Sequence, residues 1–133
     1  VDAETIDRLN ILRATHWAMA EAVRRLAALP DLVLVDGLPV KGLPCPSQSI
    51  VGGDGRSLSI AAASVMAKVT RDRMMEEYDR QYPGYGFARH KWYGTEAHLR
   101  ALLELGPTPI HRRSFRPVRE AMEIRDRLAG RTV

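Results

Sequence analysis

The sequence of 133 residues predicts an α/β fold. Two short segments, residues 32–35 and 48–52, have the composition of buried strands, and the segments around them have helical periodicity. Apolar residues make up 45% of the chain and charged residues 27%, as in a small globular protein with one core. We therefore expect residues 1–133 to form a single domain with a helical C-terminal region at about 95–130. Two strands make a thin sheet for this class, which indicates that further strands belong to the fold.

The first predicted element is a helix over residues 3–28, followed by Pro30. Its apolar or weakly polar residues recur at intervals of three and four and predict one buried face. They are Ile6, Leu9, Leu12, His16, Met19, Val23 and Leu26. On such a face His16 is expected to be a core histidine with a hydrogen-bond partner.

The two predicted strands end alike. Residues 32–35 are Leu-Val-Leu-Val and run into Asp36-Gly37, and residues 48–52 run into Gly53-Asp54-Gly55. A proline-containing loop over residues 37–47 connects them. If the strands are parallel neighbours, Asp36 and Asp54 lie at the same edge of the sheet, where open α/β sheets bind ligands.

Three helices are predicted after the strands. Residues 57–81 form the first; its first half, up to Ala67, is small or apolar all round and predicts burial on most sides. A turn over residues 82–86 follows. Thr95 caps a helix that runs to Leu105, and Pro117 opens an amphipathic helix that ends at Gly130.

The composition excludes several protein classes. No apolar run reaches the length of about 18 residues that a membrane-spanning helix needs, and the first residues lack the features of a signal peptide. Cys45 is the only cysteine, so it forms no internal disulfide, and no His or Cys stands beside it at zinc-ligand spacing. We expect a cytoplasmic protein without a membrane association.

Basic charge is concentrated late in the chain. Residues 89–119 contain seven Lys or Arg and two Asp or Glu, whereas residues 1–55 contain five and seven. Trp92, Tyr93 and Phe115 are interspersed among the basic residues. Such a segment attracts a phosphate backbone and offers flat contacts for sugars or bases, although a solvated Arg-rich surface is the alternative.

The carboxylates Asp36 and Asp54 would provide oxygen ligands for Mg²⁺ or Mn²⁺, which support phosphodiester hydrolysis. Alternatively, each Asp-Gly is only a turn dipeptide. Asp72 is excluded as a partner of Asp54 because it lies 18 residues further along a helix, roughly 25 Å at about 1.5 Å per residue.

The remaining polar residues have two interpretations each. Lys68 and Arg71 could reach phosphates or could belong to a solvated helix face. His98 lies in a predicted helix, and His90 and His111 lie in basic loops, so all three are expected to be surface residues.

The order of motifs from Gly53 to Phe115 resembles that of bacterial ribonuclease HII. It comprises residues 53–72, then Tyr82-Pro83-Gly84-Tyr85-Gly86-Phe87, His90-Lys91, Tyr93-Gly94-Thr95 and His111-Arg112-Arg113-Ser114-Phe115. Segments 6–12 and 35–37 also match, so the resemblance covers residues 4–122.

This resemblance implies a ribonuclease H-like fold and an endonuclease that cuts the RNA strand of RNA/DNA hybrids and single ribonucleotides in duplex DNA. Mn²⁺ or Mg²⁺ is the implied cofactor, with Asp36 and Asp54 as catalytic residues and metal ligands. Tyr93 matches the tyrosine that packs on the sugar next to the ribonucleotide. Lys91, Arg112 and Arg113 are expected to bind the substrate.

The sequence departs from the family pattern in three places. The family's first strand, with an Asp-Glu pair and a Gly-Arg-Gly element, has no counterpart, so the fold is expected to be incomplete and this chain inactive alone. Trp92 stands where Gly is usual, and Gly53 where Lys is common. A missing N-terminal segment is one expected partner besides the nucleic acid, and the oligomeric state stays open. The alternative is a non-catalytic nucleic-acid-binding remnant of the family.

Overall fold

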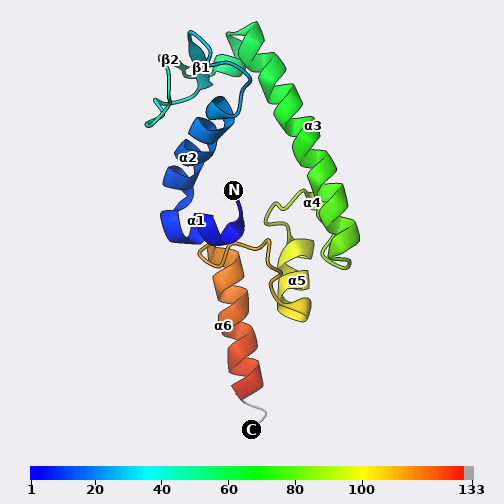
Figure 1. The fold of residues 1–133 in the computed structure, drawn as a ribbon. Helices are drawn as coiled ribbons and strands as arrows, with labels where there is room; N and C mark the ends of the chain where they lie inside the picture. The colour runs from blue at the N-terminus through cyan, green and yellow to red at the C-terminus, as the bar shows by residue number, and fades with distance from the viewer. Residues whose placement is uncertain (131–133) are drawn as a thin grey trace. The chain divides into compact units, whose positions relative to one another are not determined.

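The computed structural model describes residues 1–130, which form helices and one small sheet (Figure 1). In chain order the elements are α1 (Ala3–Leu9), α2 (Ile11–Arg24), β1 (Val33–Asp36), β2 (Ser47–Ile50), the short 3₁₀ helix η1 (Gly53–Gly55), α3 (Leu58–Gln81), α4 (Phe87–His90), α5 (Glu96–Leu105) and α6 (Arg116–Gly130). The combination of helices with a parallel pair of strands confirms the predicted α/β class.

The chain divides into two compact units. Unit 1 consists of Val1 and residues 9–69, and unit 2 of residues 2–8 and 70–133. The prediction of a single domain over residues 1–133 stays a prediction, and residues 131–133 lie outside the described residues. The units are described separately below.

The predicted single helix over residues 3–28 is wrong in two respects. It ends at Arg24, and it is broken at Asn10, which has φ 70° and ψ 165°. This conformation cannot continue a helix. Instead, the Asn10 side chain accepts a 3.0 Å hydrogen bond from the backbone N–H of Arg13 and so caps α2. The interruption therefore begins a second helix.

The predicted buried face of this region is also wrong. Leu12 is 64% exposed, and Leu26 and Met19 are exposed as well, whereas Ala14 and Ala20 are buried. His16 is half-buried, and its only hydrogen bond within residues 1–130 is a long 3.5 Å contact from the Lys41 backbone N–H. The reason is that the two-stranded sheet of unit 1 offers too little apolar surface to cover the whole stripe.

The sheet consists of two parallel strands, β1 and β2. Parallel pairing was the condition under which Asp36 and Asp54 would lie at the same edge of the sheet. Val33 pairs with Ser47 and Asp36 with Ile50. Hydrogen bonds from Val33 N to Pro46 O and from Gly37 N to Ile50 O extend the pairing by one step at each end. Both strands therefore end at the same edge of the sheet, within one or two residues of the predicted bounds.

Helix α3 spans almost the predicted residues, but its first half is not buried. Ile60 is buried, whereas Val65 is 61% and Met66 69% exposed. The residues between them are small, so they allow close packing, yet in the described residues β1 covers only the start of the helix. Burial of the rest requires surface that these residues do not supply.

Unit 2 has its own core. Its buried members are Tyr85, Phe87, Ala101, Leu102, Val118 and Ala121. Tyr85 and Phe87 stack with ring centroids 5.4 Å apart, and α5 and α6 provide the aliphatic residues. The predicted cap and end of α5 are confirmed: Thr95 Oγ1 accepts from His98 N at 3.2 Å, and α5 ends at Leu105, followed by Gly106 with φ 82°. The short helix α4 lies in a segment where no helix was predicted.

Across the described part of the chain, no helix combines the length and the apolar composition needed to cross a membrane.

Candidate functional site

The first candidate site lies at the edge of the sheet in unit 1. Asp36 is the last residue of β1, and β2 leads into η1, which carries Asp54. The backbone N–H of Gly53 donates a 2.9 Å hydrogen bond to Asp36 Oδ1. This bond fixes the segment that carries Asp54 against the end of β1. Asp36, one of the two predicted metal ligands, thus contacts the residue that directly precedes Asp54, the other.

Both carboxylates have an oxygen available for a further ligand. Asp54 Oδ1 accepts a 3.0 Å hydrogen bond from the N–H of Gly55, and both aspartates are exposed. Within residues 1–130, the Oδ2 atoms of Asp36 and Asp54 accept no hydrogen bond. Exposed carboxylate oxygens fit a hard divalent cation in type.

The number of donors is smaller than a metal site requires. No group of three or more His, Cys, Asp or Glu that could hold a metal ion occurs among the described residues. Two carboxylates are half the four that the resemblance implies. These residues therefore fit part of a divalent-cation site, and no reaction step can be derived through a metal from them alone.

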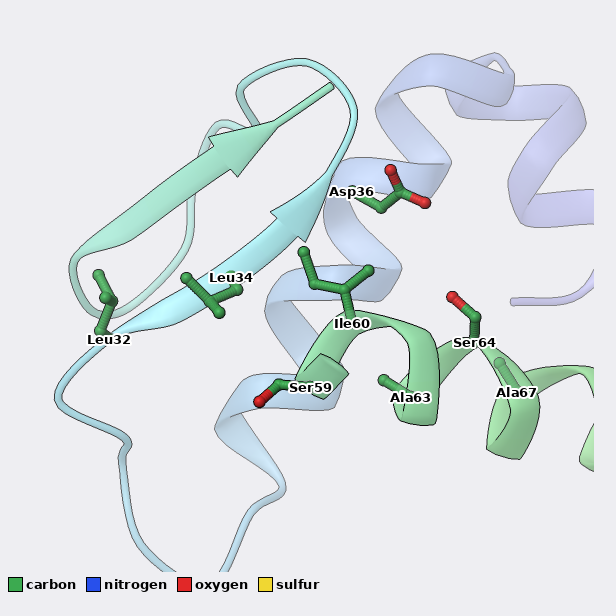
Figure 2. Close-up of a pocket in the computed structure, with 8 residues that line it drawn as sticks. All are labelled: Leu32, Leu34, Asp36, Ser59, Ile60, Ala63, Ser64 and Ala67. Carbon is green, nitrogen blue, oxygen red and sulfur yellow. The ribbon is translucent and has the colours of Figure 1, made fainter. Parts of the chain in front are cut away.

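A shallow cavity of about 490 Å³ adjoins Asp36 (Figure 2). Figure 2 shows Leu34 on β1 facing Ile60 on α3, with Asp36 at the end of the strand. The cavity is lined by Leu32, Leu34, Asp36, Ser59, Ile60, Ala63, Ser64 and Ala67. Its walls are thus mostly apolar or small, with the carboxylate of Asp36 as the only charged group.

The second candidate site is an aromatic and basic surface in unit 2. Tyr93 is 67% exposed, and the guanidinium carbon of Arg71 lies 5.4 Å from the centre of its ring. Lys91 is half-buried two residues before Tyr93. A cation beside an exposed ring can hold a phosphate while the ring contacts a sugar or base.

Arg112 and Arg113 are held in different ways. The Arg112 guanidinium lies 5.0 Å from the Trp92 ring centre and 4.8 Å from that of Phe115. Arg113 is exposed, and its backbone N–H donates a 2.9 Å hydrogen bond to Asp7 Oδ2. Within unit 2, Arg112 is thus held by aromatic rings through its side chain, and Arg113 by Asp7 through its backbone.

Asp7, on α1, binds the segment that carries Arg112 and Arg113. Its Oδ1 accepts hydrogen bonds from the backbone N–H of Ser114 at 2.9 Å and from the Ser114 hydroxyl. Partial burial alone would raise the pKa of Asp7, but the hydrogen bonds from Ser114 and Arg113 outweigh it and lower the pKa. The carboxylate is therefore ionised and clamps the segment that carries the arginines.

The predicted site residues fall into both units. Asp36 and Asp54 belong to unit 1, and Lys91, Tyr93, Arg112 and Arg113 belong to unit 2. Asp72, which the helix-length argument excluded as a partner of Asp54, lies in unit 2, on α3.

The prediction that the three late histidines are surface residues is wrong. His90, His98 and His111 are 7%, 1% and 2% exposed. They pack around Phe87 and Trp92, and His90 lies in α4 rather than in a loop. A neutral imidazole can be buried when its nitrogens have partners, and no buried side-chain nitrogen or oxygen in the described residues lacks one.

The sequence interpretation missed the roles of Asp7 and the histidines and the contact between Arg71 and Tyr93. The sequence does contain a signal for the burial of His98. This residue precedes Ala101 and Leu102 by three and four residues and so lies on the same buried helix face. The contact of Asp7 with Ser114 joins residues 107 positions apart and had no signal in one sequence.

Two departures from the family pattern have a structural consequence. Trp92 has φ 70°, a conformation that glycine adopts without strain. At Gly53, an added Cβ would lie 2.7 Å from the Ile60 Cδ1 atom, so a larger residue there requires the Ile60 side chain to turn.

The fold is that of a known nuclease structure. The crystal structure of the ribonuclease H2 from Pyrococcus horikoshii OT3 superposes with a TM-score of 0.78, covering 95% of this chain and 67% of that chain at 21% identity. At this identity the likeness establishes a ribonuclease H2-like fold, which confirms the predicted architecture.

The sequence assigns the family. The family model described as Ribonuclease HII matches residues 1–118. The ribonuclease HII of Geobacter metallireducens is 60% identical over 119 residues, which are 90% of this chain and 56% of that protein. The Coxiella burnetii enzyme is 57% identical and is covered to 59%. The chain thus belongs to the ribonuclease HII family and spans somewhat more than half the length of these relatives.

Proposed function

We propose that this chain forms part of an endoribonuclease that hydrolyses the RNA strand of RNA/DNA hybrids and cuts at single ribonucleotides in duplex DNA. The observation that carries the proposal is the parallel pairing of β1 and β2, which joins Asp36 to the Asp54 segment through Gly53 in a member of the ribonuclease HII family. We place this activity in the cytoplasm.

Asp36 and Asp54 are the proposed catalytic residues and ligands for Mn²⁺ or Mg²⁺. The Gly53 N–H donates to Oδ1 of Asp36, which leaves Oδ2 for a ligand. The chemistry that a bound divalent cation supplies at such a site is activation of water and stabilisation of the leaving oxygen. The protein residues contribute the negative charge that holds the cation and the fixed backbone that orients it.

Tyr93, Lys91, Arg112 and Arg113 form the proposed substrate surface. The Tyr93 ring is exposed and can pack on a sugar, and Arg71 beside it adds a cation within reach of a phosphate. The Trp92 and Phe115 rings limit the freedom of Arg112, so less side-chain entropy is lost on binding. These residues would bind and orient the strand, whereas the carboxylates would hold the cation.

The test compares this chain alone with the chain joined to the part of the Geobacter metallireducens relative that it does not span. We expect Mn²⁺-dependent cleavage of a labelled hybrid by the joined protein and none by the chain alone, because two carboxylates neutralise too little of the charge of two cations. Cleavage by neither protein would reject the proposal.

The alternative is a non-catalytic nucleic-acid-binding remnant. It is favoured by one observation, the lack of a third metal-binding side chain near Asp36 and Asp54 in the described residues. This alternative predicts hybrid binding that weakens steeply with salt and is indifferent to Mn²⁺. Mn²⁺-dependent strand cutting would exclude it.

A further inference from the structure

The loop that carries Tyr93 is strained. Lys91 has φ 52° and Trp92 has φ 70°, two successive non-glycine residues in the left-handed region. Such residues cost free energy and persist only where the surroundings hold them. The groups that hold this loop are the buried histidines.

The histidines contact the loop directly. The Trp92 backbone N–H donates to His90 Nδ1 at 3.0 Å, and His98 Nδ1 lies 2.9 Å from the Tyr93 carbonyl oxygen. The rings of His90 and His98 stack with centroids 4.3 Å apart. The Tyr93 carbonyl also accepts from Thr95 N at 2.8 Å, so its position is determined from two sides.

Backbone donors fix the proton on each imidazole. The Thr108 N–H donates to His111 Nδ1 at 2.9 Å, so the hydrogen of neutral His111 is on Nε2. That hydrogen points to His98 Nε2, 2.8 Å away, which must then lack one. The hydrogen of His98 is therefore on Nδ1 and is donated to the Tyr93 carbonyl.

A directed chain of hydrogen bonds thus runs from Thr108 through His111 and His98 to Tyr93. By the same reasoning, His90 carries its hydrogen on Nε2 and donates it to the Tyr85 carbonyl at 2.5 Å. Adding a proton to His98 or His111 would place two hydrogens between facing donors. The chain is therefore complete only when both rings are neutral.

We propose that His98 and His111 are positioning residues for Tyr93, which hold its carbonyl and thereby present its exposed ring to the ribonucleotide. This inference rests on the proposed function, in which Tyr93 contacts the substrate sugar. The two histidines touch no substrate themselves, because both are buried.

The surroundings favour the neutral rings. Burial lowers the pKa of His98, and burial together with the neighbouring His98 and His90 lowers the pKa of His111 to about 4. Glu4, Asp7 and Arg113 line a cavity that His111 also lines, and Arg112 lies over the Trp92 ring. Both histidines are therefore neutral at physiological pH.

A matched pair of substitutions tests the proposal. In His98→Asn the amide nitrogen lies near the former Nδ1 and can donate to Tyr93, whereas in His98→Gln it lies near the former Nε2 and cannot. Both replacements are neutral amides. The half-buried His16, on α2, provides the control His16→Gln.

The first readout is affinity of the full chain for a duplex with one embedded ribonucleotide relative to an all-DNA duplex. We expect Tyr93→Ala and His98→Gln each to reduce this ratio roughly five- to tenfold, as the loss of a ring contact does. His98→Asn and His16→Gln should leave this affinity ratio unchanged. In the Tyr93→Ala background, His98→Gln should cause no further reduction. An additive effect would show that His98 does not act through Tyr93.

The second readout is amide hydrogen exchange at Trp92 and Tyr93, which needs no nucleic acid. Exchange should accelerate at least tenfold in His98→Gln and stay unchanged in His98→Asn. Equal exchange in the two variants would overturn the positioning role. A wild-type chain that binds both duplexes equally would instead reject the proposed function and the substrate role of Tyr93, while the exchange result would still decide whether the histidines hold the loop.

Discussion

The backbone N–H of Gly53 donates a 2.9 Å hydrogen bond to Asp36 Oδ1, and this single bond ties the end of one parallel strand to the loop after the other. An asparagine at position 36 can accept the same bond, whereas an alanine cannot. A comparison of these two substitutions therefore distinguishes the structural role of the Asp36 side chain from the role of its charge.

Asp36→Asn is expected to leave the free energy of unfolding within about 0.5 kcal/mol, and Asp36→Ala to lower it by about 1 kcal/mol. Both substitutions should abolish Mn²⁺-dependent cleavage by the joined protein. Urea unfolding and a hybrid cleavage assay measure the two effects, with the exposed Asp31→Asn as control. Retained cleavage in Asp36→Asn would remove Asp36 from the catalytic site.

Removal of the Asp7 clamp should loosen the segment that carries Arg112 and Arg113. Asp7→Ala leaves the backbone N–H groups of Arg113 and Ser114 and the Ser114 hydroxyl without their acceptor. We expect a loss of about 1–3 kcal/mol in the free energy of unfolding, measured by urea titration. The exposed Glu4→Ala on the same helix serves as control. A loss equal to that of the control would contradict the clamp.

The clamp also predicts a dependence on acid. The folded-state pKa of Asp7 is lowered from 3.8, so the ionised carboxylate stabilises the folded protein. This contribution to the free energy of unfolding is fully present above pH 3.8 and is lost as the pH falls through the lowered pKa. Asp7→Asn should therefore flatten the acid limb of the stability profile below pH 4.

Stability should also fall between pH 6.5 and about 4 because of His111. Its pKa is lowered in the folded protein, so the unfolded chain binds more protons in this interval, and the free energy of unfolding decreases as the pH decreases. The shift from 6.5 to about 4 corresponds to a loss on the order of 3 kcal/mol. Thermal unfolding of the wild type and of His111→Gln measures it. The difference between the two profiles should shrink toward pH 4, and a constant difference would contradict burial of a neutral ring.

Asn10 should tolerate glycine better than alanine. Its φ of 70° strains any residue with a Cβ, and its side chain caps α2. Asn10→Gly loses the cap but relieves the strain, so we expect a free energy of unfolding within about 0.5 kcal/mol of the wild type. Asn10→Ala loses the cap and keeps the strain, at a cost of about 1–2 kcal/mol. Equal stability of the two variants in urea would show that position 10 does not have a positive φ.

The elements predicted well are those with local signals. Thr95, Gly106 and Pro117 mark helix ends by their own side-chain or backbone chemistry, and the structure places α5 and α6 within a residue of the expected bounds. The strands β1 and β2 were expected from two apolar segments with similar ends, and their parallel pairing, which the sequence left as a condition, is present in the structure. These features depend on residues close together in the chain.

The wrong predictions depend on what packs against a segment. The composition of residues 60–67 indicates a buried helix, yet Val65 and Met66 are exposed, because burial is a property of the neighbouring surface and not of the helix. The error at His98 and His111 is the reverse: surface positions were predicted, but neighbouring segments bury both side chains. Their partners, the Tyr93 carbonyl and the Thr108 N–H, are supplied by the folded backbone and have no sequence signature.

The most direct test of the proposed function is cleavage of a duplex with one embedded ribonucleotide by the joined protein, measured with Mn²⁺ and with a chelator. We expect cutting next to the ribonucleotide with Mn²⁺, no cutting with chelator, and no cutting by the Asp36→Asn or Asp54→Asn variant under either condition. Cutting that persists in both variants, or binding to the duplex without any cutting in Mn²⁺, would contradict the assignment of Asp36 and Asp54 as the catalytic carboxylates of this chain.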